Sequence, residues 1–351
     1  MAARPDLSGL TLPDDPTGAA RLLLSALQSR FPLVAEPYAA LGREVGWPEA
    51  QVREQIGAWQ SSGLVRRLGA VFDSRRLGYQ SALLAAKVAP SDVAGIALAL
   101  SAHPGITHNY LRDDAGTGYN LWFTFTAEPG TDLRRAIGEL AEAVPLPGLL
   151  ILSATRLFKI RVEFQLGGEA PAAPAPTAAA APGAEGEPGG ADLTEADWRI
   201  VRAFTPDLPL APRPFAVRGA EAGFSEQETL DLVQRLRERG IIRRFGATLK
   251  HYAVGYPANA MTVWRVAPED EERVGMILAG SPLITHCYAR NTAPGWPYNL
   301  FGMMHAPTEE ACREEAARLA AAAEVSSADY RLLYTRQELK KERLWYGGDR
   351  A

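Results

Sequence analysis

The chain has 351 residues, a length that predicts two or more domains. Hydrophobic residues make up 47% and charged residues 22%, which is typical of globular proteins with more than one core. Lys plus Arg number 37 against 41 Asp plus Glu, and this net charge of −4 argues against a dedicated nucleic-acid binder, which usually carries a basic excess.

Targeting and cysteine signals are weak. No apolar run approaches the 18 residues of a membrane span, and the N-terminus does not resemble a secretory signal segment. The two cysteines, Cys287 and Cys312, are too few for a disulfide framework or a thiolate metal site. We therefore expect a cytoplasmic protein with no membrane association.

The sequence contains an internal repeat. Residues 167–192 are almost wholly Ala, Pro, Gly and Glu, a composition that predicts an extended linker between two halves. Motifs of the first half recur in the same order in the second, which indicates a tandem duplication. The recurring motifs are RRLGA (66–70) and RRFGA (243–247), THNYLR (107–112) and THCYAR (285–290), and YNL at 119–121 and 298–300.

Each half opens with three helical patterns, at Thr17–Phe31, Tyr38–Val45 and Glu49–Ser62 in the first half. In the second half the third helix begins with the capping box Ser225-x-x-Glu228. The following segments, 64–72 and 241–249, alternate like the strands of a β-wing. This order predicts a winged helix-turn-helix in residues 1–80 and again in 193–257.

The rest of each half alternates strand, helix, strand, strand, helix, strand, which is the ferredoxin-like βαββαβ plan. We predict such domains in residues 81–166 and 258–351, so the fold class is α+β. The first-half elements are expected at 82–88, 94–101, 106–112, 119–126, 132–143 and 149–161. One sheet face is left open in this plan, and the other copy is expected to cover it.

The second predicted strand of each βαββαβ unit carries the candidate chemistry. Because side chains alternate along a strand, His, Tyr and Arg of each row share the open face of the sheet. The two rows are His108, Tyr110 and Arg112, and His286, Tyr288 and Arg290. A buried cationic row needs a partner, and an anionic ligand between the sheets would supply one. Each His could instead be a hydrogen-bonded structural residue, since duplication copies such residues too.

Arginines accumulate in the same segments, and their guanidinium groups suit a polycarboxylate ligand. The candidates are Arg66, Arg67, Arg243 and Arg244. We interpret Arg75 and Arg76 as solvated, and His103 and His305 as structural. His251 has no counterpart in the first half, where Ser74 stands, so a fold requirement explains it poorly.

These motifs resemble the Lrp/AsnC family, and more specifically its siroheme decarboxylase branch. The first half (RRLGAVFDS, THNYLR, YNLWF) is similar to one subunit type, and the second (RRFGATLKH, HCYAR, WPYNLF) to the other. The chain thus resembles a fusion of the two, as in heme d1 biosynthesis. The resemblance implies loss of two acetate carboxyls from siroheme as CO₂, giving 12,18-didecarboxysiroheme, a carboxy-lyase reaction.

The resemblance also implies roles for residues. His108, His251 and His286 are the candidate proton donors. The substrate's iron would be ligated, if at all, by His251 or His286, and no other cofactor or resident metal is expected. Further candidates for gripping substrate carboxylates are Tyr119, Lys250, Tyr298 and Asn299, beside the tyrosines and arginines named above. The chain could form a homodimer or associate with other proteins of its pathway.

Two other functions remain open from the sequence. A DNA-binding regulator would need a basic third helix, yet residues 48–63 and 224–240 each carry a net charge of −1. A protein that binds tetrapyrrole without turning it over is the second alternative, which only a product assay separates from the enzyme.

Overall fold

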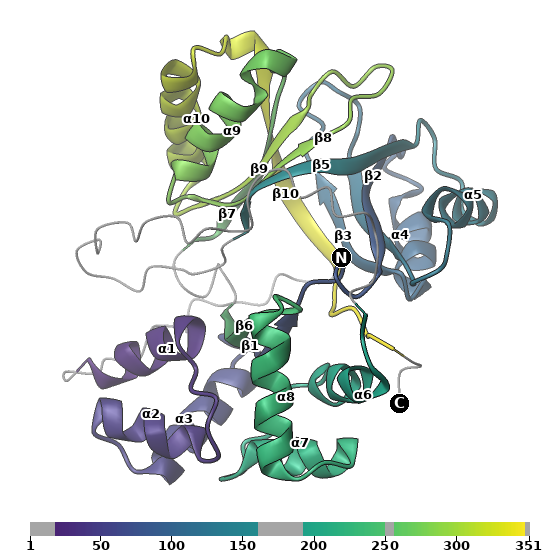
Figure 1. Ribbon diagram of the computed structural model, residues 1–351. Coiled ribbons are helices and arrows are strands. Elements are labelled where there is room, and N and C mark those ends of the chain that lie inside the picture. The colour runs from purple at the N-terminus through teal and green to yellow at the C-terminus, as the bar shows by residue number, and fades with distance from the viewer. Residues whose placement is uncertain (1–17, 161–191, 250–255, 348–351) are drawn as a thin grey trace.

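The computed structural model describes residues 18–160, 192–249 and 256–347. Its elements form two bodies, a helical one and a β-barrel, which are stacked on each other (Figure 1). The two halves of the chain contribute to both bodies. The tandem duplication and the α+β class are confirmed, while the predicted linker at 167–192 lies, except for Asp192, outside the described residues.

The helical body contains three helices from each half. They are α1 (Ala19–Ser29), α2 (Pro37–Val45), α3 (Glu49–Ser61), α6 (Glu195–Phe204), α7 (Pro214–Ala222) and α8 (Glu226–Glu238). The predicted capping box is present, since Ser225 and Glu228 bond each other's backbone N–H groups at the start of α8. Gly63 and Gly240 follow α3 and α8 with positive φ values, as expected for left-handed caps.

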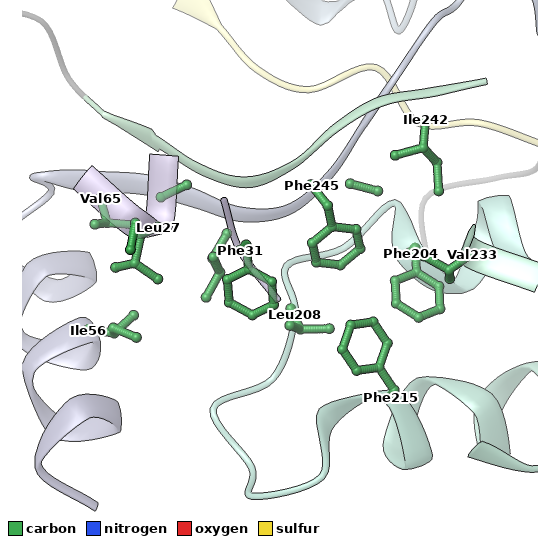
Figure 2. Close-up of a cluster of buried hydrophobic side chains, with 14 of the residues drawn as sticks. Leu27, Phe31, Ile56, Val65, Phe204, Leu208, Phe215, Val233, Ile242 and Phe245 are labelled. Atoms are coloured by element: carbon green, nitrogen blue, oxygen red, sulfur yellow. The ribbon is translucent and has the colours of Figure 1, made fainter. Parts of the chain in front are cut away.

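One hydrophobic core joins the two sets of helices. Phe31 from α1's end contacts Phe245, with 5.5 Å between ring centroids, and Phe245 contacts Phe215 at 5.7 Å. Phe204 lies 5.9 Å from Phe215 and completes the aromatic group, which Figure 2 shows with its aliphatic neighbours. Because first-half and second-half side chains are buried together, neither helical set has a core of its own.

The strands expected to form two β-wings pair with each other instead. β1 (Val65–Phe72) and β6 (Ile242–Leu249) form a two-stranded antiparallel ribbon between the halves, in which Gly69 lies opposite Gly246. A single strand must satisfy its backbone hydrogen bonds, and the duplicated copy offers a partner of similar sequence. The three-helix part of the prediction is confirmed, and the ribbon is what joins the two copies.

Eight strands form the barrel. They are β2 (Gln80–Ala86), β3 (Ile106–Arg112), β4 (Leu121–Ala127), β5 (Leu150–Ile160), β7 (Ala258–Trp264), β8 (Ile284–Arg290), β9 (Leu300–Ala306) and β10 (Tyr330–Lys341). Each half keeps the ferredoxin-like order within its own sheet, β3-β4-β2-β5 and β8-β9-β7-β10. The two sheets then join edge to edge, β5 to β8 and β10 to β3, which closes the barrel.

Helices cover the outside of the barrel on two sides (Figure 1). The first half contributes α4 (Val93–Ala102) and α5 (Leu133–Ala143), and the second α9 (Glu271–Gly280) and α10 (Glu309–Ala323). Each half also anchors a helix of the other. Lys159 on β5 donates to the Ser281 carbonyl after α9 (2.7 Å), and Lys340 on β10 donates to the Ser101 carbonyl of α4 (2.6 Å). The sheets therefore cover each other as expected, by forming one closed surface.

Candidate active site

A cavity of about 500 Å³ occupies the inside of the barrel and the space beneath the β1–β6 ribbon. Its wall comes from inward-facing residues of the barrel strands. Its other side is formed by Arg67 on β1, Ser74 and Arg75 after β1, Arg243 on β6, and the chain that follows β10. Both halves and both bodies therefore contribute to one cavity.

Both predicted His-Tyr-Arg rows line this single cavity. The structure brings together His108, Tyr110 and Arg112 of β3 with His286, Tyr288 and Arg290 of β8. The opposite strand face lies under the helices, where the fully buried Cys287 places its Sγ 3.7 Å from the Gly275 carbonyl of α9. Both strands have a register irregularity just before the histidine, a feature that turns side chains next to many active sites.

Two arginines lie deep in the barrel and are held mainly by uncharged groups. Arg112 donates to Thr335 Oγ1 (2.7 Å), and Arg290 donates to the Leu152 carbonyl (2.8 Å). Each guanidinium also lies over the tyrosine of its own row, 5.0 Å from Tyr110 and 5.2 Å from Tyr288. Among the described residues, the buried Nε of each arginine has no hydrogen-bond partner. Burial lowers both arginine pKa values to about 10, still far above neutrality, so both remain charged.

The two histidines are oriented in the same way by neighbouring threonines. Thr107 Oγ1 lies 2.8 Å from His108 Nδ1, and Thr285 Oγ1 lies 3.0 Å from His286 Nδ1. Burial and then the positive charge of Lys341 lower the pKa of His108 to about 3 and that of His286 to about 4. Both rings are therefore neutral at pH 7 in this structure. A bound polyanion would raise both pKa values, because opposite charge favours the protonated form.

The ribbon side of the cavity is also cationic. Arg67 is half-buried, and desolvation lowers its pKa. Arg243 is held in place by Asp73, which accepts from its Nε (2.8 Å) and Nη2 (2.7 Å). Among the described residues that line the cavity, seven are Arg or Lys and one is acidic, Glu342. Such a surplus of positive charge suits a ligand with several carboxylates.

The chain after β10 ties the barrel to the helical body. Arg343 donates to the Thr205 carbonyl (2.6 Å) and to Asp207 (2.7 Å), and Tyr79 accepts from the backbone N of Gly347 (3.0 Å). Leu344 and Tyr346 pack against the helical core. Arg343 and Tyr346 also line the cavity, so this connection forms part of the site.

Five of the described residues predicted to bind carboxylates lie outside the cavity lining, and three of them belong to the Tyr-Asn-Leu motifs. Tyr119 and Tyr298 are buried against Trp296, with ring centroids 5.5 and 5.0 Å apart. Asn299 accepts from the backbone N of Val266 (2.9 Å) and donates to Glu271 (3.1 Å). The repeated Tyr-Asn-Leu motif therefore holds the start of a strand in each half, a structural need that duplication copied.

Two predicted arginines also serve the fold. Arg66 donates to the Lys341 carbonyl (2.6 Å), beside the cavity lining. Arg244 donates to the carbonyls of Gln28 and Ala247, which fastens β6 to the end of α1. Along a strand, Arg66 and Arg67 face opposite ways, as do Arg243 and Arg244, so only one of each pair reaches the cavity. His251 and Lys250 lie outside the described residues.

Sequence reasoning missed several lining residues. Arg75 is exposed, as interpreted, and it also lines the cavity. His305 was interpreted as structural, yet it lines the cavity together with Phe301 and Met303 of the same strand. Alternation along 301, 303 and 305 would have placed His305 inward. His103 does lie outside the lining, at the end of α4, where its Nδ1 accepts from Gly105 N (3.0 Å).

Three of the basic residues on or next to the two third helices are engaged within the protein, while Arg237 of α8 is exposed. On α3, Arg53 donates to Glu49 (3.1 Å). On α8 and just after it, Arg235 and Arg239 bond the fully buried Asp197, at 2.6 and 3.1 Å. Side chains held in this way are poorly placed to contact a phosphate backbone.

The described residues contain neither a membrane-spanning helix nor a cluster of metal ligands. None of their helices is long and apolar enough to cross a membrane. No group of three or more His, Cys, Asp or Glu among them is arranged to hold a metal ion.

Comparison with protein families gives two matches, each in both halves. The AsnC-like ligand binding domain matches residues 76–159 and 253–340. The siroheme decarboxylase NirDL-like HTH domain matches residues 20–66 and 197–243. The first matches fall on the two βαββαβ units and the second on the two sets of three helices.

Individual proteins are similar over nearly the whole chain. A siroheme decarboxylase of Hydrogenobacter thermophilus is 35% identical over 327 residues, 92% of this chain and 93% of the relative. The crystal structure of the siroheme decarboxylase NirDL in co-complex with an iron-uroporphyrin III analogue matches with a TM-score of 0.69 and 32% identity, covering 93% of this chain and 94% of that one. A siroheme decarboxylase beta subunit of Methanosarcina barkeri is 41% identical over 149 residues, 42% of this chain and 97% of the subunit.

Proposed function

The chain belongs to the siroheme decarboxylase family, and on that premise we propose that it converts siroheme to 12,18-didecarboxysiroheme. The observation that carries this proposal is the single cavity lined by both His-Tyr-Arg rows, with seven cationic residues and one acidic residue among its described lining. A tetrapyrrole with eight carboxylates is a ligand of the required charge. The iron arrives with this substrate.

The reaction needs a proton for each CO₂. The bond between the acetate methylene and its carboxylate breaks, and the electron pair stays on the methylene carbon beside the pyrrole. One proton then adds to that carbon, so that an acetate becomes a methyl group. A histidine is suited to deliver this proton, because binding of the polyanion would bring its lowered pKa back toward neutrality.

The arginines would hold the carboxylates that do not react. Arg112 and Arg290 each keep a buried Nε without a partner among the described residues, so each can donate to a ligand at little cost. A tight grip on the departing carboxylate would stabilise the ground state and slow the step. The arginines are therefore expected to contact carboxylates that the substrate keeps, and not the carboxylates that leave as CO₂.

The structure bears differently on the two alternative functions, a DNA-binding regulator and a siroheme carrier. A DNA-binding role is not favoured, because Arg53, Arg235 and Arg239 are engaged by carboxylates within the protein. A carrier that binds siroheme without reaction shares the same cavity and charge. Turnover is what distinguishes it from the enzyme.

The test is anaerobic incubation of the purified chain with siroheme, followed by mass analysis of the tetrapyrrole. We expect loss of two CO₂ with no other cofactor added. The variants His108→Gln and His286→Gln should bind siroheme, measured by its absorption spectrum, and should lose roughly 10²–10⁴-fold in rate where the histidine is the acid. His251→Ala is the third variant, because His251 has no counterpart in the first half. Siroheme that binds the native chain and is recovered with all eight carboxyls would favour the carrier.

A further inference from the structure

The two His-Tyr-Arg rows are alike, but the strands beside them are not. On β5, Ile160 pairs with His286 and Leu157 with Tyr288. On β10, Lys341 pairs with His108 and Glu338 with Tyr110. One row thus has apolar cross-strand neighbours, while the other has charged ones.

These neighbours occupy corresponding positions. One residue before Ile160 and one before Lys341, the two strands carry Lys159 and Lys340. These lysines pair with Cys287 of β8 and Asn109 of β3, on the strand face opposite the two rows. Both lysines also donate to a carbonyl at the end of a helix of the other half, at 2.7 and 2.6 Å. The register is therefore the same on both sides, and the contrast between Ile160 and Lys341 is a substitution within one framework.

Lys341 places a positive charge at the wall beside His108. It is partly buried, lines the cavity, and has Glu338 3.8 Å from its Nζ. Glu338 also forms an ion pair with Arg66, at 3.5 Å. The group of Lys341, Arg66 and Glu338 has two cations and one carboxylate, so its net charge is positive. Lys341 also lowers the pKa of His286, as do Arg243 and Lys159, but the cross-strand neighbour of Lys341 is His108, whereas that of His286 is the apolar Ile160. Leu157 and Ile160 line the opposite wall.

A charged wall and an apolar wall act differently on a carboxylate that is about to leave. A cation beside an acetate stabilises its charge, and that stabilisation is lost as the charge moves onto carbon and CO₂ departs. An apolar wall gives no such stabilisation and favours the neutral product CO₂. The step next to Ile160 should therefore be faster than the step next to Lys341.

We infer that Lys341 determines the order of the two decarboxylations: the acetate at the Leu157–Ile160 wall reacts first, and the acetate beside Lys341 is held until second. This inference rests on the proposed function, and it makes Lys341 a specificity-determining residue. Each step breaks one carbon–carbon bond, releases one CO₂ and takes up one proton, as above. A single monodecarboxylated regioisomer should then precede the final product.

The experiment is anaerobic rapid-quench turnover of siroheme, with the monodecarboxylated intermediate isolated and its regiochemistry assigned by NMR. The native chain should give one regioisomer. Lys341→Met should give both in comparable amounts, and the ratio of first to second rate constants should fall roughly tenfold, the usual effect of one charge-assisted contact. Because this ratio is internal to one protein, a general loss of activity does not mimic the result.

Matched variants separate charge from packing. Lys341→Arg keeps the charge and should keep the single intermediate, and Ile160→Met keeps an apolar wall and should do the same. The exchange variant, Ile160→Lys with Lys341→Ile, should give the opposite regioisomer. Titration with iron uroporphyrin would establish that each variant still binds a polycarboxylate tetrapyrrole.

The outcomes distinguish the two proposals. A native chain that decarboxylates siroheme through a mixture of intermediates, or a Lys341→Met chain that retains one intermediate and an unchanged ratio, would overturn the role of Lys341 alone. A native chain that binds siroheme and releases no CO₂ would overturn the proposed function as well.

Discussion

The paired glycines of the β1–β6 ribbon allow a test with a built-in control. Gly69 and Gly246 lie opposite each other and have nearly equal φ values, +155° and +154°. A Cβ at residue 246 would lie 2.3 Å from the Leu27 carbonyl oxygen of α1, whereas one at residue 69 would meet nothing nearer than 3.6 Å. The two alanine variants therefore share the backbone strain and differ in the clash.

The expected magnitudes follow from these distances. Alanine at this φ costs roughly 1–3 kcal/mol at either position. At residue 246 the carbonyl of Leu27 must also retreat by about 0.7 Å to reach the 3.0 Å lower limit, which is overpacking of a kind that costs roughly 1–3 kcal/mol more. Gly246→Ala should thus destabilise the helical body by about 2–6 kcal/mol, and Gly69→Ala by about half as much.

Urea unfolding followed by far-UV circular dichroism would measure both free energies of unfolding. Because Arg243 lies on the same strand as Gly246, tetrapyrrole affinity should also fall in Gly246→Ala and change less in Gly69→Ala. Equal destabilisation by the two substitutions would refute the argument that the approach of α1 requires glycine at residue 246.

Two further predictions concern buried polar groups. The variant Asn109→Cys introduces the residue that stands at the matching position of β8. It should raise the free energy of unfolding by about 1 kcal/mol, measured by urea titration. The reason is that both side-chain polar atoms of the buried Asn109 lack hydrogen-bond partners among the described residues. The native chain should lose stability as pH falls below about 6.5, by up to roughly 1.4 kcal/mol per pH unit for each of His108 and His286. The reason is that both pKa values are lowered in the folded chain, so the histidines of the unfolded chain become protonated at a higher pH. Melting temperatures between pH 6.5 and 4.5 should show a shallower slope for the double variant His108→Gln with His286→Gln, and an equal slope would contradict the assigned pKa shifts.

Local pattern predicted the inward rows well. Alternation alone grouped His108, Tyr110 and Arg112, because a strand fixes which side chains share a face. The covered face was equally predictable from the small Cys287 and its neighbours. Helix caps such as Ser225 and Gly240 were readable for the same reason, since they depend on a few adjacent residues.

Contacts between distant segments were harder to predict. The pairing of β1 with β6 joins residues about 177 positions apart, and nothing within either strand distinguishes it from a wing. Recurrence does not distinguish packing residues from ligand-binding ones, because duplication preserves both, and Tyr119 and Tyr298 lie outside the cavity lining. Lys341 and Arg343 were missed because the pairing of β10 with β3, and then the path of the chain after β10, bring them to the cavity.

The edge-to-edge closure of the barrel bears on why the two copies are joined in one chain. A homodimer of one copy would have twofold symmetry, and symmetry would make both walls of its cavity identical. Two different copies escape this constraint, but as separate molecules they can still pair with themselves. Covalent linkage raises the effective concentration of the correct partner and fixes a one-to-one ratio. An uneven pocket, such as the one with Lys341 on one side and Ile160 on the other, can then persist through evolution without competition from symmetric assemblies.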